Sequence, residues 1–161
     1  MIVADTSALI SLASIGILDI CLTEFETHTT DTVRQELEET SEYEDSHANA
    51  ADTVLESIDR KAIHQVNSEF TSSRVDKGEG SCAVLTNELK AEFLITDDLR
   101  ALPELQTLTD AQVAISPIVL KALVKRGELE HDGAVSKLEQ LADARDWLGA
   151  PIYRRAKNLF E

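Results

Sequence analysis

Residues 1–12 read MIVADTSALISL, an apolar stretch interrupted by a single carboxylate. Residues 1–4 form the short apolar run of a buried strand, and residues 8–13 have the apolar pattern of the first turns of a helix. One carboxylate, Asp5, lies at the junction and is followed by two hydroxyl residues. Aspartate is a favoured helix N-cap. Asp5 is therefore either a cap or a functional group, and the choice depends on whether other acids meet it.

Short apolar runs and helical patterns alternate along the rest of the chain. Further strands are predicted at residues 26–29, 63–66, 92–96 and 111–116. Helices are predicted at residues 17–25, 32–40, 51–61, 81–91, 99–106 and 117–127, while the polar segment 41–50 fits a loop or a helix extension. This alternation predicts an α/β fold, a three-layer sandwich around a central, mostly parallel sheet.

The length of 161 residues is enough for one domain with a real core. We expect a single domain over residues 1–161, with a core at about 1–125 and a helical C-terminal extension at about 126–161. Two amphipathic stretches, 132–149 and 151–161, make up this extension. Their apolar side chains are expected to pack on the body of the domain or on a partner chain.

The charge of the chain is strongly negative. Thirty acidic residues stand against fifteen lysines and arginines, giving a net charge of −15 that is spread along the sequence. This excludes a protein that binds nucleic acid through a large basic face. It is typical of a halophilic protein in a salty cytoplasm, where hydrated carboxylates keep proteins soluble.

Neither the apolar pattern nor the N-terminus indicates a membrane or secreted protein, and the two cysteines fit the same interpretation. No apolar run reaches the roughly 18 residues of a membrane span. The N-terminus lacks the features of a signal peptide, so a cytoplasmic protein is expected. Cys21 and Cys82 lie in apolar helical contexts and are expected to be buried free thiols.

Carboxylates follow two of the predicted strands. Asp5 follows the first strand, and Asp97 and Asp98 follow the strand at 92–96. In an open parallel sheet, ligands bind beyond the carboxyl ends of the strands, where the strand order reverses. Glu36 and Glu79 lie on or beside helices whose starts can face the same edge. Each acid also has a structural alternative, as a helix cap, a solvated surface charge or a partner of a helix dipole.

Together these carboxylates would repel one another unless a cation bound between them. A site with oxygen ligands alone favours Mg²⁺ or Mn²⁺ over zinc. Such ions support hydrolysis of phosphodiester bonds by activated water. The acid pattern thus indicates a metal-dependent hydrolase of a polyanion.

Four motifs carry a resemblance to a known family: VADTSALISL, VRQEL, GEGSCAVL and LITDD. In this order and at these separations they resemble a PIN domain, the small nuclease fold of VapC-like toxins and RNA-processing endoribonucleases. The resemblance covers about residues 1–125. The remainder, with its DWLGAPIYRRA, is similar to the extra C-terminal helices of one prokaryotic PIN branch.

The resemblance implies a metal-dependent endoribonuclease, in some members the toxin of a toxin–antitoxin pair. It implies a Mg²⁺ or Mn²⁺ cofactor, RNA as substrate, an antitoxin protein as partner and a homodimer. The catalytic residues implied are Asp5, Glu36, Glu79, Asp98 and Ser7, and the metal ligands are the same four acids together with Asp97.

One position departs from the family pattern. Members often carry a carboxylate where this chain has Ser81, which leaves Glu79 as the acid of that turn. A catalytically weak or inactive PIN-like module that binds RNA or a protein is therefore the alternative. A phosphatase-like hydrolase with Asp5 as nucleophile fits less well, because it would need a second aspartate where Ser7 stands. Candidate RNA contacts, each better explained as a solvated surface charge, are Arg100, Arg154, Arg155 and Lys157.

Overall fold

The computed structural model describes residues 1–67 and 70–161. These residues form five strands, β1 (Ile2–Ala4), β2 (Thr27–Thr30), β3 (Ile63–His64), β4 (Phe93–Ile95) and β5 (Gln112–Ala114). The helices are α1 (Thr6–Ser14), α2 (Leu18–Glu24), α3 (Asp31–Ser41), α4 (Ser46–Ser57), α5 (Lys77–Leu89), α6 (Leu102–Leu108), α7 (Pro117–Lys125), α8 (His131–Ala144) and α9 (Pro151–Asn158), with a 3₁₀ turn at Arg60–Ala62.

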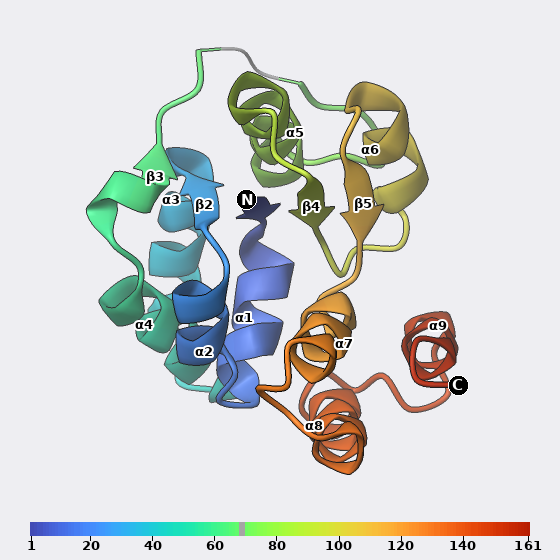
Figure 1. Ribbon diagram of the computed structural model, residues 1–161. Coiled ribbons are helices and arrows are strands. Elements are labelled where there is room, and N and C mark those ends of the chain that lie inside the picture. Colours follow the sequence, from blue (N-terminus) through green and yellow to red (C-terminus); the bar gives the residue numbers. More distant parts are fainter. Residues whose placement is uncertain (68–69) are drawn as a thin grey trace.

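The strands form one parallel sheet in the order β3-β2-β1-β4-β5 (Figure 1). Val3 of β1 is paired with His28 of β2 on one side and Leu94 of β4 on the other. The chain leaves β1 toward β2 and later returns to pair β4 on the opposite side of β1. The strand order therefore reverses between β1 and β4, which is the place where open α/β sheets bind ligands.

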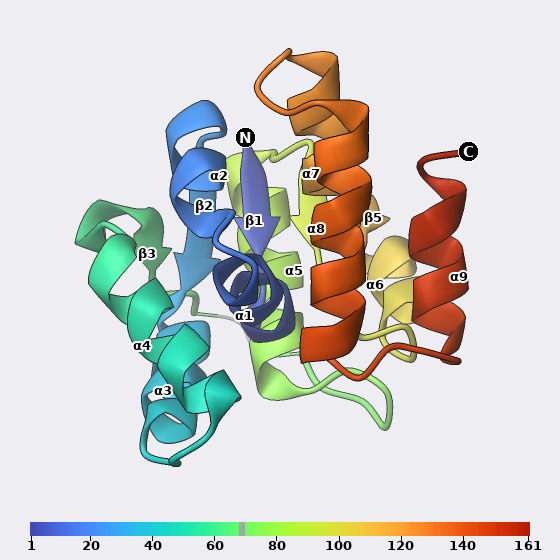
Figure 2. The same cartoon turned by 90° about the horizontal axis from the view of Figure 1, so that it is seen from below.

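Helices cover both faces of the sheet. Helices α5 and α6 lie on one face, while α1, α2 and α7 lie on the other, with α8 outside α7 (Figures 1 and 2). The central strands are buried from both sides, which explains why β1 and β4 are apolar runs without polar alternation. The predicted α/β three-layer sandwich is confirmed, and the sheet is parallel throughout the described residues.

Short polar side chains begin several of the helices. Asp5 accepts a hydrogen bond from the backbone N–H of Ala8 and caps α1. Thr30 caps α3 in the same way through Val33 N–H. Each cap pairs a backbone donor that the first helical turn leaves without a partner. The starts of these helices are therefore held at the carboxyl edge of the sheet.

Several helix boundaries differ from the sequence prediction, and two of the differences have a clear structural cause. Helix α4 begins at Ser46, inside the segment that fitted either a loop or a helix extension, because Asp45 caps it. Helix α8 ends at Ala144 and does not continue to residue 149. Asp146 adopts a left-handed conformation with φ 56°, and Trp147 N–H donates to Ala142 O over 2.8 Å. These are the bonds of a Schellman C-cap, with aspartate in the place usually taken by glycine.

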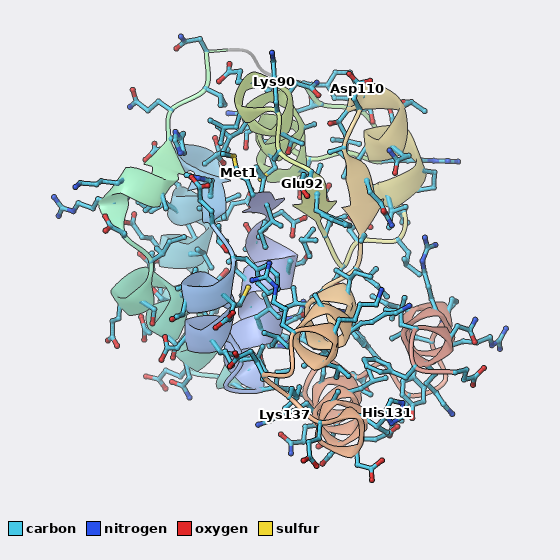
Figure 3. The ribbon with its side chains drawn as sticks, in the orientation of Figure 1. Met1, Lys90, Glu92, Asp110, His131 and Lys137 are labelled. Atoms are coloured by element: carbon cyan, nitrogen blue, oxygen red, sulfur yellow. The ribbon has the colours of Figure 1, made fainter. Side chains whose placement is uncertain are left out.

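The C-terminal helices pack on the body of the same chain. Lys137 of α8 donates from Nζ to the carbonyl of Ile15 at the end of α1, over 2.9 Å; Figure 3 labels this lysine. Trp147 and Ile152 are buried in the core that these helices complete. Figure 3 also labels Met1 and Glu92, which come directly before β1 and β4 at the amino-terminal edge of the sheet.

Cys21 and Cys82 are buried free thiols, as predicted. Among the described residues, no single helix is long and apolar enough to cross a membrane. The pair α1 and α2, bent by 115° at its break, meets that criterion only when both helices are taken together, and only by length and composition.

Candidate metal-binding cleft

A cleft of about 370 Å³ opens at the carboxyl edge of the sheet, at the β1/β4 switch point. Its lining combines acids, hydroxyls, one aliphatic side chain, a histidine and an arginine. These residues are Asp5, Thr6, Ser7, Ile10, Glu36, Thr40, His47, Asp76, Glu79, Asp98 and Arg145. The structure thus brings together five of the six predicted site residues, from four separate segments of the chain.

Asp5 is both a helix cap and a cleft residue. Its Oδ1 accepts hydrogen bonds from Ala8 N–H over 3.0 Å and from Ser7 Oγ over 2.8 Å. The side chain is 3% exposed, and this burial raises the pKa of Asp5 to about 7, despite hydrogen bonds that lower it. Ser7 Oγ also accepts from Asp97 N–H over 2.9 Å. The serine therefore joins the end of β1 to the end of β4.

Glu36 reaches the cleft from α3. Thr6 Oγ1 donates to its Oε2 over 2.8 Å. A Cβ at Gly78 would lie 2.0 Å from Glu36 Oε1, so the glycine permits this carboxylate to approach the first turn of α5. Burial raises the pKa of Glu36. The position of this acid thus depends on a hydroxyl from α1 and on a missing side chain in α5.

Glu79 and Asp76 begin α5 as a capping box. Asp76 Oδ1 accepts from Glu79 N–H over 2.8 Å, and Glu79 Oε1 accepts from Asp76 N–H over 2.9 Å. Burial, followed by the neighbouring Asp98 carboxylate, raises the pKa of Glu79. Asp76 was not among the predicted site residues. The sequence DKGE could have identified Asp76, because an acid at the N-cap of α5 lies at the same edge of the sheet as Glu79.

The two aspartates after β4 have different environments. Asp98 lines the cleft, and its Oδ1 accepts from the backbone N–H groups of Arg100 and Ala101 over 2.9 and 3.3 Å. Asp97 does not line the cleft. Its Oδ1 and Oδ2 accept from the N–H and Oγ of Ser116, over 2.6 and 2.7 Å. Both Asp97 oxygens are thus engaged at the start of α7.

Ser81, the departure from the family pattern, is turned away from the cleft. Its Oγ donates to Gly78 O and shares a hydrogen bond with Thr30 Oγ1, each over 2.7 Å. Ser81 therefore joins α5 to the start of α3. Its role in the structure is to hold two of the segments that carry cleft acids.

The chemistry of the lining suits a hard cation. Its acids offer oxygen ligands only, and backbone donors occupy one oxygen of Asp5, Glu79 and Asp98. Buried carboxylates with raised pKa values gain most when a cation replaces their protons. No three His, Cys, Asp or Glu side chains of the described residues stand close enough together to hold an ion as they are. Binding would therefore require side-chain rotation, as the second oxygens turn inward.

One cation also lines the cleft. Arg145 follows the last residue of α8, and burial lowers its pKa while Asp97 and Asp5 raise it. The sequence did not mark Arg145 as a site residue, because the predicted amphipathic helix extended to residue 149 and so placed Arg145 inside it.

A parallel α/β sandwich with an acidic cleft at its switch point is compatible with a nuclease-type domain. The family model DUF3368, described as a PIN domain, matches residues 1–161. The chain therefore belongs to this PIN-domain family. No curated protein and no solved structure matches it significantly. PIN domains are generally nucleases and typically use divalent metals.

Proposed function

We propose that this chain is a metal-dependent endoribonuclease that uses Mg²⁺ or Mn²⁺ to hydrolyse RNA phosphodiester bonds. The observation that carries the proposal is the convergence of Asp5, Glu36, Asp76, Glu79 and Asp98 on one cleft at the β1/β4 switch point. Four of these acids are the ones that the resemblance implied. Acids gathered this closely in a protein of net charge −15 need a cation before a polyanion can approach them.

The residues of the chain have distinct tasks in this proposal. Asp5, Glu36, Glu79 and Asp98 would offer carboxylate oxygens to the ion. Ser7 orients Asp5 and at the same time holds the backbone after β4. When bound, Mg²⁺ or Mn²⁺ supplies a Lewis acid for the phosphodiester and makes hydroxide available near neutral pH. Asp76 orients Glu79 through the capping box.

The test is cleavage of single-stranded RNA by the purified full chain, with EDTA, Mg²⁺ or Mn²⁺ and at low and high salt. Cleavage is expected only with the ions. It should be lost in Asp5→Asn and Asp98→Asn, which keep the shape of each side chain and its ability to accept a backbone hydrogen bond. Asp52→Asn, at an exposed position of α4, is the matched control. Cleavage that persists in both cleft variants would refute the proposal.

A catalytically inactive module that binds RNA or protein is the second candidate. It is favoured by the capping roles of Asp5 and Asp76 and by the turn hydrogen bonds of Asp98, since these roles alone suffice to keep the acids in place. Calorimetric titration with Mn²⁺ separates the two candidates. A nuclease should bind the ion through these carboxylates, whereas an inert module should show no binding that Asp5→Asn removes.

The finer aspects of the proposal concern partners. We propose that the chain is the toxin of a toxin–antitoxin pair and that it forms a homodimer. A small open reading frame beside the gene, encoding a protein that co-purifies with this chain and inhibits cleavage, would support the toxin role. Light scattering coupled to size exclusion tests the dimer. Full cleavage activity over a range of salt up to molar KCl would support the halophilic character that the charge suggests.

A further inference from the structure

Arg145 is held in place by the end of α8. The Schellman bonds around Asp146 and Trp147 stop the helix at Ala144, so that the next side chain turns toward the carboxyl edge of the sheet. Figure 2 shows α8 running past α1, with its C-terminal end at the edge where the strands end. Lys137, two turns earlier, anchors α8 to the carbonyl of Ile15. The arginine thus projects from a fixed part of the structure.

The guanidinium group is only partly paired. Within residues 1–67 and 70–161, none of the ion pairs closer than 4.0 Å includes Arg145. Its one hydrogen bond in that part of the chain is a long one, from Nη1 to His47 Nε2 over 3.4 Å. Arg145 interacts electrostatically with Asp5 and Asp97 but forms no ion pair with either of them. Most of its five N–H donors therefore have no hydrogen-bond partner among the described residues.

Among the described lining residues, Arg145 is the one lysine or arginine. The positive charge of Arg145 beside the candidate metal ligands would repel a metal ion, so this arginine does not help to bind the metal. It is suited to a planar, doubly accepting anion, since the guanidinium fork matches two oxygens of a phosphate. The nearby carboxylates already have partners in capping and serine hydrogen bonds.

We infer that Arg145 binds a phosphate of the RNA backbone at the cleft, so that the C-terminal extension supplies the positive charge that the PIN core lacks there. This inference rests on the proposed function for its substrate class. It assigns to α8 a part in substrate binding in addition to its structural role. It also explains how an acidic chain without a basic face can bind a polyanion at one point.

The experiment measures binding of RNA without cleavage. All proteins carry Asp98→Asn, and a short fluorescein-labelled oligouridine is titrated in Mg²⁺ by fluorescence anisotropy over a series of KCl concentrations. Arg145→Ala should weaken the affinity about tenfold or more, the loss expected for a charge-assisted contact. It should also make the dependence of log K on log salt shallower by about 0.7, one phosphate contact on a single strand. Arg145→Lys should be intermediate.

Arg60→Ala is the matched control, because Arg60 is an exposed arginine in the 3₁₀ turn before β3 and does not line the cleft. It should bind as tightly as the parent. If Arg145→Ala does not fold, Arg145→Gln keeps part of the stem while it removes the charge and the guanidinium fork. Unchanged affinity and an unchanged salt slope in a folded Arg145 variant would overturn the inference.

The outcomes also separate this inference from the proposed nuclease function. A chain that cleaves no RNA in any metal but loses RNA affinity with Arg145 supports the inference and refutes the nuclease. A chain that cleaves RNA with the same KM and kcat in Arg145→Ala, in an otherwise wild-type background, refutes the inference and leaves the nuclease standing.

Discussion

Replacing Asp5 by asparagine should stabilise the protein when no divalent ion is present. Asp5 is almost wholly buried, and burial raises its pKa from the ordinary value of 3.8 to about 7. The folded state therefore holds the Asp5 proton more tightly than the unfolded state does. Between pH 3.8 and pH 7 the unfolded chain has lost this proton while the folded chain keeps it, so stability falls as the pH rises.

The size of the effect follows from that difference. Each unit of pKa corresponds to about 1.4 kcal/mol, so a rise of roughly three gives an upper limit of about 4 kcal/mol at about pH 8. Asparagine is as good an N-cap as aspartate and carries no charge to bury. The free energy of unfolding of Asp5→Asn should therefore exceed that of the wild type by up to about 4 kcal/mol at about pH 8. Below the ordinary pKa of aspartate the gain should vanish.

The assay is urea unfolding, followed by circular dichroism in EDTA, at several values between about pH 4 and about pH 8. Asp52→Asn on α4 is the control and should change little, because its carboxylate is exposed. Mn²⁺ should then reverse the order, since it stabilises only a chain that binds it. A variant no more stable than the wild type at about pH 8, or a gain independent of pH, would refute the reasoning.

Three further predictions concern the cleft and the end of α8. Gly78→Ala places a methyl group where Glu36 Oε1 lies and should displace this carboxylate from the cleft. The Mn²⁺ affinity measured by calorimetry should therefore fall about tenfold, or about 1.4 kcal/mol. Undiminished affinity would show that the glutamate is not a ligand. Asp98→Asn should weaken Mn²⁺ binding more than Asp97→Asn does, because serine donors already engage both oxygens of Asp97; equal losses would return Asp97 to the ligand set. Asp146→Gly should raise the free energy of unfolding by about 0.5–1 kcal/mol in urea titrations, since glycine adopts the left-handed conformation without strain; a loss would indicate that the aspartate side chain stabilises the turn.

The strands and the main acids were predictable because both depend on local pattern and simple topology. A strand buried on both faces must be apolar, so β1 and β4 stand out in the sequence. Parallel strands end at one edge, which brings Asp5 and Asp98 to the same cleft. No exact register or packing is needed for either inference.

The remaining site residues depend on details that local pattern does not encode. Asp97 and Asp98 are adjacent and chemically identical, and local pattern does not reveal the Ser116 hydrogen bonds that hold Asp97 away from the cleft. Arg145 depends on where α8 ends. That end is determined by the burial of Trp147 and by an aspartate in a left-handed conformation, where the sequence signal would be a glycine.

The capping bonds in the cleft affect how related sequences should be interpreted. Asp5, Asp76 and Asp98 each satisfy backbone N–H groups where a helix or turn begins. A relative that had lost its chemistry would still be under pressure to retain these aspartates for folding. Their presence in such a relative is therefore weak evidence of activity. Asparagine and serine cap a helix as well as aspartate does, but they bind cations poorly. Their presence at these positions in a relative would therefore indicate that it has kept the fold and lost the catalytic activity.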